Sequence, residues 1–488
     1  MPAPAIAWMR NDFRLADNAV LTLAAKGGRP VLPVFPFCSS GEGWSSIGAA
    51  SRWWLHHSIG RFSTALADRG APMILLHGAP ADVLPRLAAA VGADEVIASR
   101  RFEPHARDEE NAVRDVLAVR GVRAAYLNTS LLHDPDAIRT GSDKPYRVFT
   151  PFWKKVQAEV SDDRLYGAIP ELNLSAPDQA TLAAAKALPE TVPLDELGLL
   201  PTIPWDAEFG TFWTPGEAGA HERLERFLDA VLGGYDDSRN VPSIDGTSAL
   251  SPHLHFGEIS PRQVARAVRD RLDDDPSVDV GAKSFLSEIG WREFGHHVLH
   301  HFPDTIDQPL NPKFERFPYR EEAAELRRWQ RGLTGYPIVD AGMRQLWRIG
   351  WMHNRVRMIV GSFLTKHLLQ PWWKGAEWFW DTLVDADLAA NTLGWQWIGG
   401  TGADAAPYFR VFNPITQGEK FDPDGAYIRR WVPELSRLPA DVIHKPWTAK
   451  PIELAEAGIE LGQTYPRPIV DHPEARQRAL DALATLKT

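Results

Sequence analysis

The segment from Asp385 to Trp397 brings together two acids, an amide and two indoles. It reads Asp-Ala-Asp-Leu-Ala-Ala-Asn-Thr-Leu-Gly-Trp-Gln-Trp, and 11 of the 19 Trp in the chain lie between Trp291 and Trp431. A hydrophobic core rarely needs so many indoles, because Leu and Val fill space without an N–H group to satisfy. This density predicts a surface that stacks planar ligands and also a path for electrons.

Glu288, Trp291 and Arg292 stand at spacings i, i+3 and i+4, so on a helix they share one face. An acid, an indole and a guanidinium on one face can stack a nucleobase and hydrogen-bond its edge. The same spacing fits a solvated acid–Arg pair beside a core Trp equally well. Spacing alone leaves both interpretations open.

A second helix is predicted from Trp351 onward. Asn354 and Met358 are four residues apart and face the same way, and Arg357 is a candidate partner for one of the later acids. An ordinary helix with its charges outside explains the same pattern.

The loop from Gly246 to His255 carries three hydroxyl side chains and free backbone amides, and it leads toward Ser260 and Pro261, a typical helix start. Such a loop can cradle a pyrophosphate without a lysine. Taken by itself, the loop is explained at least as well by a plain Ser/Thr turn.

The sequence does not predict a metal site. Asp385 and Asp387 supply too few oxygen ligands for a hard cation, which needs about six. Two histidine pairs, His296–His300 and His297–His301, have a possible zinc spacing, but no third ligand stands at a suggestive distance in the sequence. Cys38 is the only cysteine, which excludes an intrachain disulfide and a four-Cys metal site.

The elements that must position these residues fall into two classes, so the expected fold class is α/β followed by all-α. Short apolar runs alternate with helical stretches over the first 130 residues, which predicts a Rossmann-like parallel sheet without a dinucleotide fingerprint. The expected strands are 5–9, 31–36, 73–77, 95–98 and 124–128, and the expected helices are 17–26, 48–69, 80–91 and 107–120. We expect an α/β domain at 1–133, a surface linker at 134–205 and a helical domain at 206–488, with helices at 216–232, 260–272, 281–301, 322–331, 338–349, 353–369 and 375–384.

Composition and charge set wider bounds. The chain has 488 residues, of which 24% are charged and 44% hydrophobic, which is typical of a soluble globular protein. No apolar run is long enough to span a membrane and no secretory signal is evident, so we expect a cytoplasmic protein. The net charge of −10 disfavours nucleic acid as a partner, yet residues 281–430 hold 18 basic against 17 acidic residues. A local basic face is therefore possible.

Taken together, these segments resemble the DNA photolyase/cryptochrome family, and most of all its bacterial members that repair cyclobutane pyrimidine dimers. The resemblance extends nearly from end to end. The segments that carry it, in order, are Ile6–Asn18, Thr247–Ser251, Trp291–Glu293, Thr334–Asp340, Gly350–Arg355, Asp385–Trp397 and Phe412–Pro414.

The resemblance implies FAD, bound in a folded shape within the helical domain. Its pyrophosphate would lie on the loop, Asp385 and Asp387 would face the ribose and the flavin ring, and Asn391 would lie at flavin N5. Arg357 would pair with Asp385. The implied cofactor-binding residues are Tyr235, Thr247, Ser248, Ala249, Leu250, Ser251, Arg292, Arg357, Asp385, Asp387 and Asn391.

The resemblance further implies light-driven repair of pyrimidine dimers in UV-damaged DNA, with the lesion turned out of the helix into a pocket. Trp291 and Trp397 would flank the dimer and Glu288 would hydrogen-bond a pyrimidine edge. The implied catalytic residues are Glu288, Trp291, Asn354, Met358, Asn391 and Trp397, and the implied DNA-binding residues are Arg239, Trp291, Asn354, Arg355, Arg410 and Gln417.

Asn354 and Met358 favour cyclobutane dimers as substrate. Relatives that repair (6-4) photoproducts have His at both positions, and neither Asn nor Met can act as an acid at neutral pH. A cryptochrome-type light sensor without repair activity is the alternative. Such sensors often carry long tails, whereas only a short segment follows Trp447 here.

The resemblance also implies an electron path and a second chromophore. Trp395 and Trp372 match the family's path for photoreduction of the flavin, but Tyr319 stands where a third Trp is expected. The antenna chromophore would be a folate near residues 103–107, where Ala106 replaces a typical acid, and the adjacent indoles of Trp53 and Trp54 could stack a pterin or pack in the core. We expect a monomer.

Overall fold

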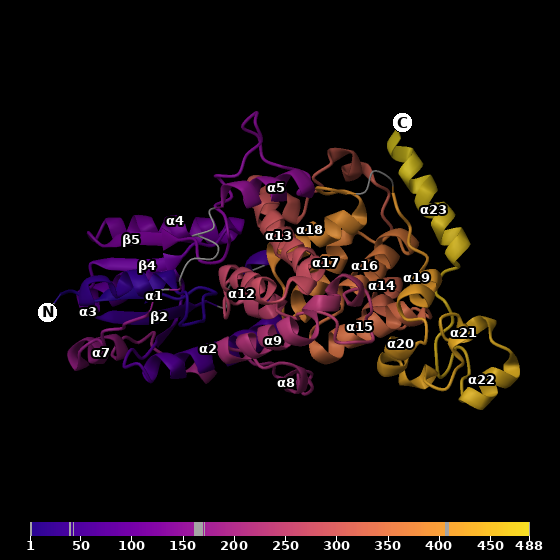
Figure 1. Ribbon diagram of the computed structural model, residues 1–488, viewed down its shortest axis with the longest axis horizontal. Helices are drawn as coiled ribbons and strands as arrows, with labels where there is room; N and C mark the ends of the chain where they lie inside the picture. The colour runs from indigo at the N-terminus through magenta and orange to yellow at the C-terminus, as the bar shows by residue number, and fades with distance from the viewer. Residues whose placement is uncertain are drawn as a thin grey trace.

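The computed structural model describes residues 2–38, 41, 43–160, 169, 171–405 and 409–487. A parallel sheet with its helices forms the N-terminal part, and an assembly of helices forms the rest (Figure 1). The predicted fold class, α/β followed by all-α, is confirmed.

The sheet has five strands in the order β3-β2-β1-β4-β5, and every neighbouring pair is parallel. All five predicted strands are present. They are β1 (Ala5–Trp8), β2 (Val31–Phe37), β3 (Ile74–His77), β4 (Glu95–Ser99) and β5 (Arg123–Leu127). Because the central strand β1 is buried on both faces, its sequence reads as a continuous apolar run.

Helices cover both faces of the sheet, as the alternating pattern predicts. They are α1 (Ala19–Ala24), α2 (Ala49–Ala67), α3 (Pro80–Val91) and α4 (Pro104–Ala118). Successive side chains of a strand point to opposite faces. Ala5 and Ala7 of β1 therefore pack with α1 and α2, whereas Ile6 and Trp8 pack with α3 and α4.

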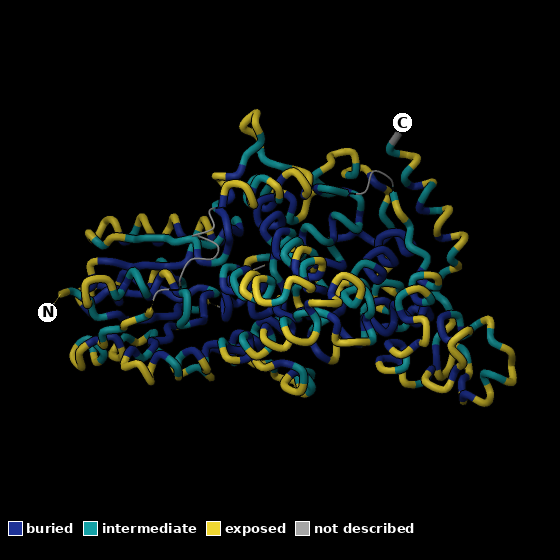
Figure 2. Tube along the Cα trace, viewed as in Figure 1, coloured by how far each residue is buried: buried dark blue, intermediate teal, exposed yellow. Residues whose placement is uncertain are grey.

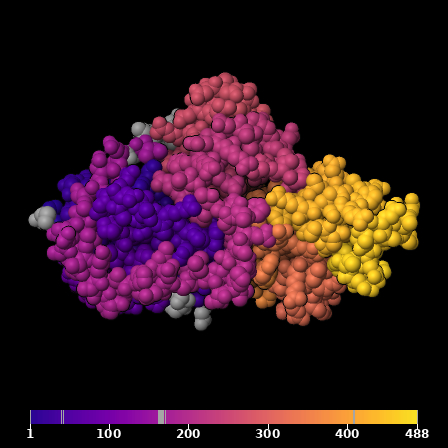
Figure 3. All heavy atoms as spheres, turned by 90° about the horizontal axis from the view of Figure 1, so that it is seen from below, coloured from indigo at the N-terminus to yellow at the C-terminus, as the bar shows by residue number. Residues whose placement is uncertain are grey.

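The predicted surface linker packs on both parts of the molecule, since its first helix lies against α13 (Asp279–His301) and its second against α3. It contains α5 (Phe149–Glu159) and α7 (Gln179–Lys186), and α7 packs on α3 through the buried Ala185. Single β-bridges join Pro30 to Ser175 and Leu76 to Thr191. Residues after 171 therefore lie along the N-terminal part, whose indigo surface they border in Figure 3. The domain boundaries at 133 and 205 remain predictions.

The remaining chain is helical, and each helix predicted there is found with small shifts at its ends. The helices are α8 (Phe209–Phe212), α9 (Glu217–Ala230), α10 (Tyr235–Ser238), α11 (Ser251–His255), α12 (Pro261–Asp274), α13 (Asp279–His301), α14 (Ala323–Gln330), α15 (Pro337–Ile349), α16 (Asn354–Ser362), α17 (Trp372–Thr382), α18 (Leu388–Gly399), α19 (Pro414–Phe421), α20 (Ala426–Trp431), α21 (Ala440–Ile443), α22 (Pro451–Ala457) and α23 (His472–Ala484). A π-helical turn, Phe363–His367, continues α16.

Helix α18 is the most important element that the sequence does not predict. Its residues are apolar on most sides, so they show no 3.6-residue alternation of apolar and polar positions. The helix lies against α13, α16 and α17, and its trace is dark blue and teal except at one exposed residue in Figure 2. Asp387 caps its N-terminus and Gly400, with φ of 79°, ends it.

Across the described residues, no helix is both long enough and apolar enough to cross a membrane.

Candidate active site

The site is centred on Asp385, which precedes α18. Its carboxylate accepts hydrogen bonds from the Arg357 guanidinium of α16 at 2.9 and 3.1 Å. The Ser251 hydroxyl at the start of α11 donates to the same carboxylate at 2.6 Å. Three segments far apart in the sequence therefore meet at one charge, and Arg357 pairs with the acid that the family resemblance implies.

The loop before α11 is shaped to receive a ligand. Ala249 adopts a left-handed conformation with φ of 48°, and a side chain at Gly246 would collide with the Ser238 carbonyl. In the described parts of the chain, no group accepts a hydrogen bond from the amides of Thr247, Ser248 or Ala249. Unpartnered amides at the start of a helix suit an anion such as a pyrophosphate.

The other predicted cofactor-binding residues in this region differ in their exposure to solvent. Leu250 is buried, and Tyr235 packs edge-on against Phe227 and Phe285. Burial raises the pKa of the Tyr235 hydroxyl, so it stays protonated. Ser251 is exposed although its neighbours along α11 are buried, which indicates that it borders an open space. The loop and the Asp385 pair together fit the FAD that the resemblance implies.

Asp387 lies in different surroundings from Asp385. One of its oxygens accepts the Ala390 amide at 2.8 Å and so caps α18. The other lies 3.3 Å from Nδ1 of His255 and 3.4 Å from Nε2 of His296. Burial raises the pKa of Asp387, but these histidines hold that pKa well below its usual value. The predicted contact of Asp387 with FAD remains a prediction.

Asp387 lines a pocket of about 330 Å³ between the sheet and the helical part. Arg10, Arg100 and Arg101 reach it from the carboxyl ends of β1 and β4, where ligands bind in open α/β sheets. Arg292 also lines this pocket, and its guanidinium donates to the Ser130 carbonyl at 2.7 Å. Arg292 therefore lies at this pocket, and its predicted contact with FAD remains a prediction.

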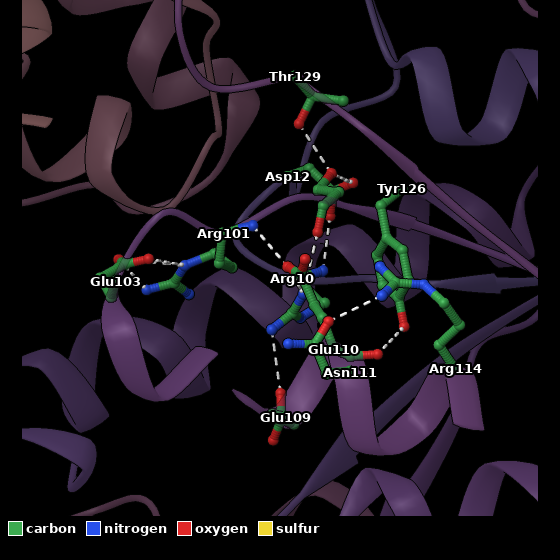
Figure 4. Close-up of polar contacts among 11 residues, drawn as sticks. Arg10, Asp12, Arg101, Glu103, Glu109, Glu110, Asn111, Arg114, Tyr126 and Thr129 are labelled. Atoms are coloured by element: carbon green, nitrogen blue, oxygen red, sulfur yellow. Dashed lines mark hydrogen bonds and ion pairs between the residues drawn. The ribbon is translucent and has the colours of Figure 1, made fainter. Parts of the chain in front are cut away.

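A network of ion pairs fixes the sheet side of this interdomain pocket (Figure 4). Arg10 bonds Glu110 at 2.5 Å and Glu109 at 3.0 Å, and Arg101 bonds Glu103 at 2.6 Å. Burial raises the pKa of Glu103, but Arg101 holds that pKa well below its usual value. The pocket wall is therefore charged and rigid.

Asn391 and Trp395 lie one turn apart on α18. The Asn391 side-chain amide donates to the Ala376 carbonyl of α17 at 3.0 Å, which orients the amide. Trp395 is 2% exposed, and its ring centroid lies 5.0 Å from Phe379 and 6.2 Å from Trp329.

A further indole, Trp373, contacts two residues of the predicted electron path. Trp372, the first residue of α17, is 5.8 Å from Trp373 between ring centroids, and Trp373 is 5.2 Å from Tyr319. Trp372 and Trp395 belong to one buried cluster, while Trp373 and Tyr319 are half-buried at its edge. Trp373 is thus the intermediate between Trp372 and Tyr319.

Trp291 of α13 is supported on one face. Its ring lies parallel to that of Phe149 in α5, with centroids 3.9 Å apart and 10° between the planes. Because Phe149 occupies one face of the indole, only the other face is available to a planar ligand. The residue is half-buried, in agreement with a partly open ring.

Glu288 lies one turn before Trp291 and is paired. Arg239 of the α10 end bonds Glu288 at 2.7 Å and Ser284 at 3.3 Å. Asn240, which follows Arg239 in the chain, accepts a hydrogen bond from Arg355 of α16 at 2.5 Å. Glu288 of α13, Arg239 and Asn240 at the end of α10, and Arg355 of α16 thus form one continuous rim.

A second pocket, of about 400 Å³, adjoins this rim. Met358, Trp397 and Arg410 line it, and Arg355 approaches the Met358 sulfur at 3.7 Å. Asn354 starts α16 and is exposed, and Gln417 of α19 is half-buried. The predicted lesion-contacting residues Met358 and Trp397 therefore share one pocket.

Trp53 and Trp54 pack in the core. Both are almost fully buried in α2, and the Trp54 indole donates to Glu258 at 3.0 Å. Of the two interpretations that the sequence leaves open for them, packing is the one that the structure shows. Ala106 is buried as well.

Comparison with known proteins identifies the family. Residues 5–173 match the model of DNA photolyase, and residues 285–485 match that of the FAD binding domain of DNA photolyase. The chain is 47% identical to the deoxyribodipyrimidine photo-lyase of Agrobacterium fabrum, over 99% of this chain and 98% of that one. The chain belongs to the DNA photolyase/cryptochrome family. The predicted family is confirmed.

Two further relatives cover both branches of this family. A bacterial class III photolyase from Agrobacterium tumefaciens superposes with a TM-score of 0.92 at 46% identity, over 100% of this chain and 98% of that one. Cryptochrome-2 of Arabidopsis thaliana is 38% identical over 99% of this chain and 79% of its own length. Similarity to both branches leaves the choice between repair and sensing to the site itself.

Three features of the photolyase site were missed at the sequence level. Phe149 behind Trp291 and the Arg239–Glu288 pair join residues more than 40 positions apart, for which the sequence carries no signal. Lys366, the third, lies buried in the second pocket, where its ammonium contacts the Phe409 ring and bonds the Gly399 carbonyl at 2.5 Å. A lone lysine in the apolar run 359–369 was the only sequence signal for it.

Proposed function

We propose that this photolyase-family protein repairs cyclobutane pyrimidine dimers in DNA with light, using FAD. The observation that carries the proposal is the pocket that Met358 shares with Trp397, close to the rim formed by Glu288, Arg239 and Arg355. It has an aromatic face for a planar lesion and a rim of charged groups for its edges and backbone.

Different residues bind the pyrimidines and the phosphate backbone of the damaged DNA. Trp397 stacks one pyrimidine of the flipped dimer, and the free face of Trp291 contacts the other, each stack contributing about 1–3 kcal/mol. Arg239 and Arg355 neutralise backbone phosphates near the lesion, while Glu288 accepts a hydrogen bond from a pyrimidine edge. Because Glu288 is held by Arg239, its carboxylate is already oriented before DNA arrives.

When bound, reduced FAD would supply the light-driven one-electron chemistry that breaks the two carbon–carbon bonds of the cyclobutane ring, with the electron returned at the end. The repair is therefore redox-neutral overall. The loop 247–249 would hold the pyrophosphate by its amides, and the Arg357–Asp385 pair would contact the flavin ring. Asn391, oriented by the Ala376 carbonyl, would present its amide to N5.

Substrate choice rests on Asn354 and Met358. Repair of a (6-4) photoproduct needs a proton donor beside the lesion, and neither side chain can supply one. The neighbouring His353 does not replace it, because burial lowers its pKa to about 4 and its Nδ1 accepts the Arg355 amide. We therefore assign cyclobutane dimers as the substrate.

The decisive experiment follows the ultraviolet absorbance of an oligothymidylate that contains cyclobutane dimers. Purified protein with reduced flavin should restore the absorbance of the pyrimidine bases under blue light and leave it unchanged in darkness. Restoration of (6-4) lesions alone would contradict the substrate assignment. Light-induced spectral changes of the flavin without any repair would instead favour the sensor function of a cryptochrome.

We also propose a second, light-harvesting chromophore, a folate, in the interdomain pocket. Glu103 lines this pocket, and Arg100 reaches it half-buried, with no counter-charge in the described residues. A guanidinium suits the carboxylates of a folate tail. The purified protein should show a near-UV band separate from flavin, and Arg100→Gln should diminish it. An unchanged band in this variant would place the chromophore elsewhere.

A further inference from the structure

The C-terminal end of α13 carries a side-chain cluster that the repair reaction does not use. His300 and His301 are the last two residues of this helix, and the linker residue Asp136 lies beside them. One ligand atom from each of the three lies within 4.8 Å of the others. The sequence offered no third ligand for the histidines of α13, and the fold supplies one from 164 residues away.

We propose that Asp136, His300 and His301 bind a divalent transition-metal ion such as Zn²⁺. Two imidazoles and one carboxylate are a common ligand set of zinc sites with an open fourth position. Nε2 of His300 lies 2.9 Å from the Asp136 carboxylate, a hydrogen bond that would open to about 3.3 Å when both atoms bind one tetrahedral ion. Nε2 of His301 lies 2.9 Å from the Pro135 carbonyl on the same linker turn.

Nδ1 of His300 is buried and has no hydrogen-bond partner in the described parts of the chain, whereas Nε2 faces Asp136 and is the nitrogen placed to bind an ion. The His300 ring packs edge-on against Phe102 of the α/β part at 6.1 Å. A metal ion here would join the linker to α13 close to the α/β part, and so would hold three segments together. The site does not depend on the proposed repair function.

One neighbour opposes the metal. The Arg139 guanidinium lies 3.6 Å from Asp136 and 3.9 Å from Asp143, so a cation must compete with it for the Asp136 carboxylate. His297 also lies close, with its ring centroid 4.6 Å from that of His301.

The test uses the chelator-treated, flavin-containing full chain and Zn²⁺ alone, titrated by calorimetry. Wild type should bind one ion, and Asp136→Asn and His300→Gln should each weaken binding by at least about tenfold. Arg139→Gln should tighten it, because the competing cation is gone. Asp304→Asn, an exposed acid one turn beyond the helix end, should change nothing.

A second measurement keeps the proposal falsifiable if His300→Gln does not fold. Cu²⁺ bound to wild type should show nitrogen hyperfine coupling from two imidazoles in its paramagnetic resonance spectrum. Asp136 is 61% exposed, so Asp136→Asn should fold and should weaken Zn²⁺ binding. Wild-type affinity in Asp136→Asn, or a Cu²⁺ spectrum without imidazole nitrogen, would overturn the assignment.

Discussion

The indole of Trp395 lies directly over Gly375. An added Cβ at Gly375 would overlap three ring atoms of Trp395, so α17 and α18 approach closely only because this position has no side chain. Trp372, one turn before Gly375, makes only an ordinary contact with Gly399 of α18, 3.9 Å from an added Cβ. Of these two indoles in the proposed electron path, Trp395 is the one that needs a glycine beneath it.

Gly375→Ala should therefore displace the Trp395 ring. We expect photoreduction of the flavin to slow by about tenfold or more and the protein to lose about 1–3 kcal/mol of stability, as in an overpacked core. Transient absorption and chemical denaturation measure the two effects.

Gly394→Ala is the matched control, because it lies on the same helix α18 and an added Cβ meets nothing within 4 Å. It should leave photoreduction unchanged and stabilise the helix by about 0.5–1 kcal/mol. Equal photoreduction rates in the two variants would mean that Trp395 does not take part in the electron path.

Tyr319→Phe should slow photoreduction but spare repair by enzyme that is reduced beforehand. Burial raises the pKa of the Tyr319 hydroxyl, so oxidation of this residue must expel a proton that leaves reluctantly. The slow step should show a solvent isotope effect, which the Phe variant lacks. Unchanged kinetics in Tyr319→Phe would make Trp373 the terminal donor, since its ring is the one adjacent to Tyr319.

Phe149→Leu should weaken binding of dimer-containing DNA without affecting photoreduction. The parallel stack at 3.9 Å fixes the Trp291 ring, and such aromatic pairs contribute about 0.5–1.5 kcal/mol beyond burial. Loss of this support should raise the dissociation constant for lesion DNA about two- to tenfold.

Undamaged duplex DNA provides the control for Phe149→Leu, because phosphate contacts do not involve Trp291. Its affinity should stay the same. A parallel loss for both DNAs would show that Phe149 supports the fold rather than the lesion pocket.

Stability should fall in mild acid. Burial, together with neighbouring positive groups, lowers the pKa of His297, His353 and His367 to about 2, 4 and 3, from an ordinary 6.5. As pH falls below 6.5 the unfolded chain takes up these protons before the folded chain does. The stabilisation is thus complete above pH 6.5 and is lost below it, by about 1.4 kcal/mol per pH unit for each histidine.

His353→Asn isolates one of these groups. Asn can still cap α16, where His353 now accepts the Arg355 amide, but it does not titrate. Urea denaturation between pH 4 and 6.5 should give a shallower loss of stability than in wild type, by about one proton. Identical pH dependence of stability in the variant and wild type would mean that His353 does not stay neutral in the folded protein.

The α/β part could be predicted almost in full, because each strand is a short apolar run between turn signals and each helix between strands has its own pattern. The hydroxyl-rich loop 246–255 and the motifs of the DNA photolyase family were visible for a related reason: their residues are close together in the chain. Helix α18 was not predicted, since a helix buried on most sides shows no alternation of apolar and polar residues.

The sequence by itself determined which chemical groups are present: the acids, indoles and hydroxyl loop of the proposed flavin and lesion sites, and side chains at Asn354 and Met358 that cannot donate a proton. Only the tertiary structure decided their partners. It separated Asp385, paired with Arg357, from Asp387, which turns to His255 and His296. Asp136 reaches His300 in the same way, across 164 residues. Such pairs depend on how helices pack, and packing is set by the whole buried surface rather than by any local pattern.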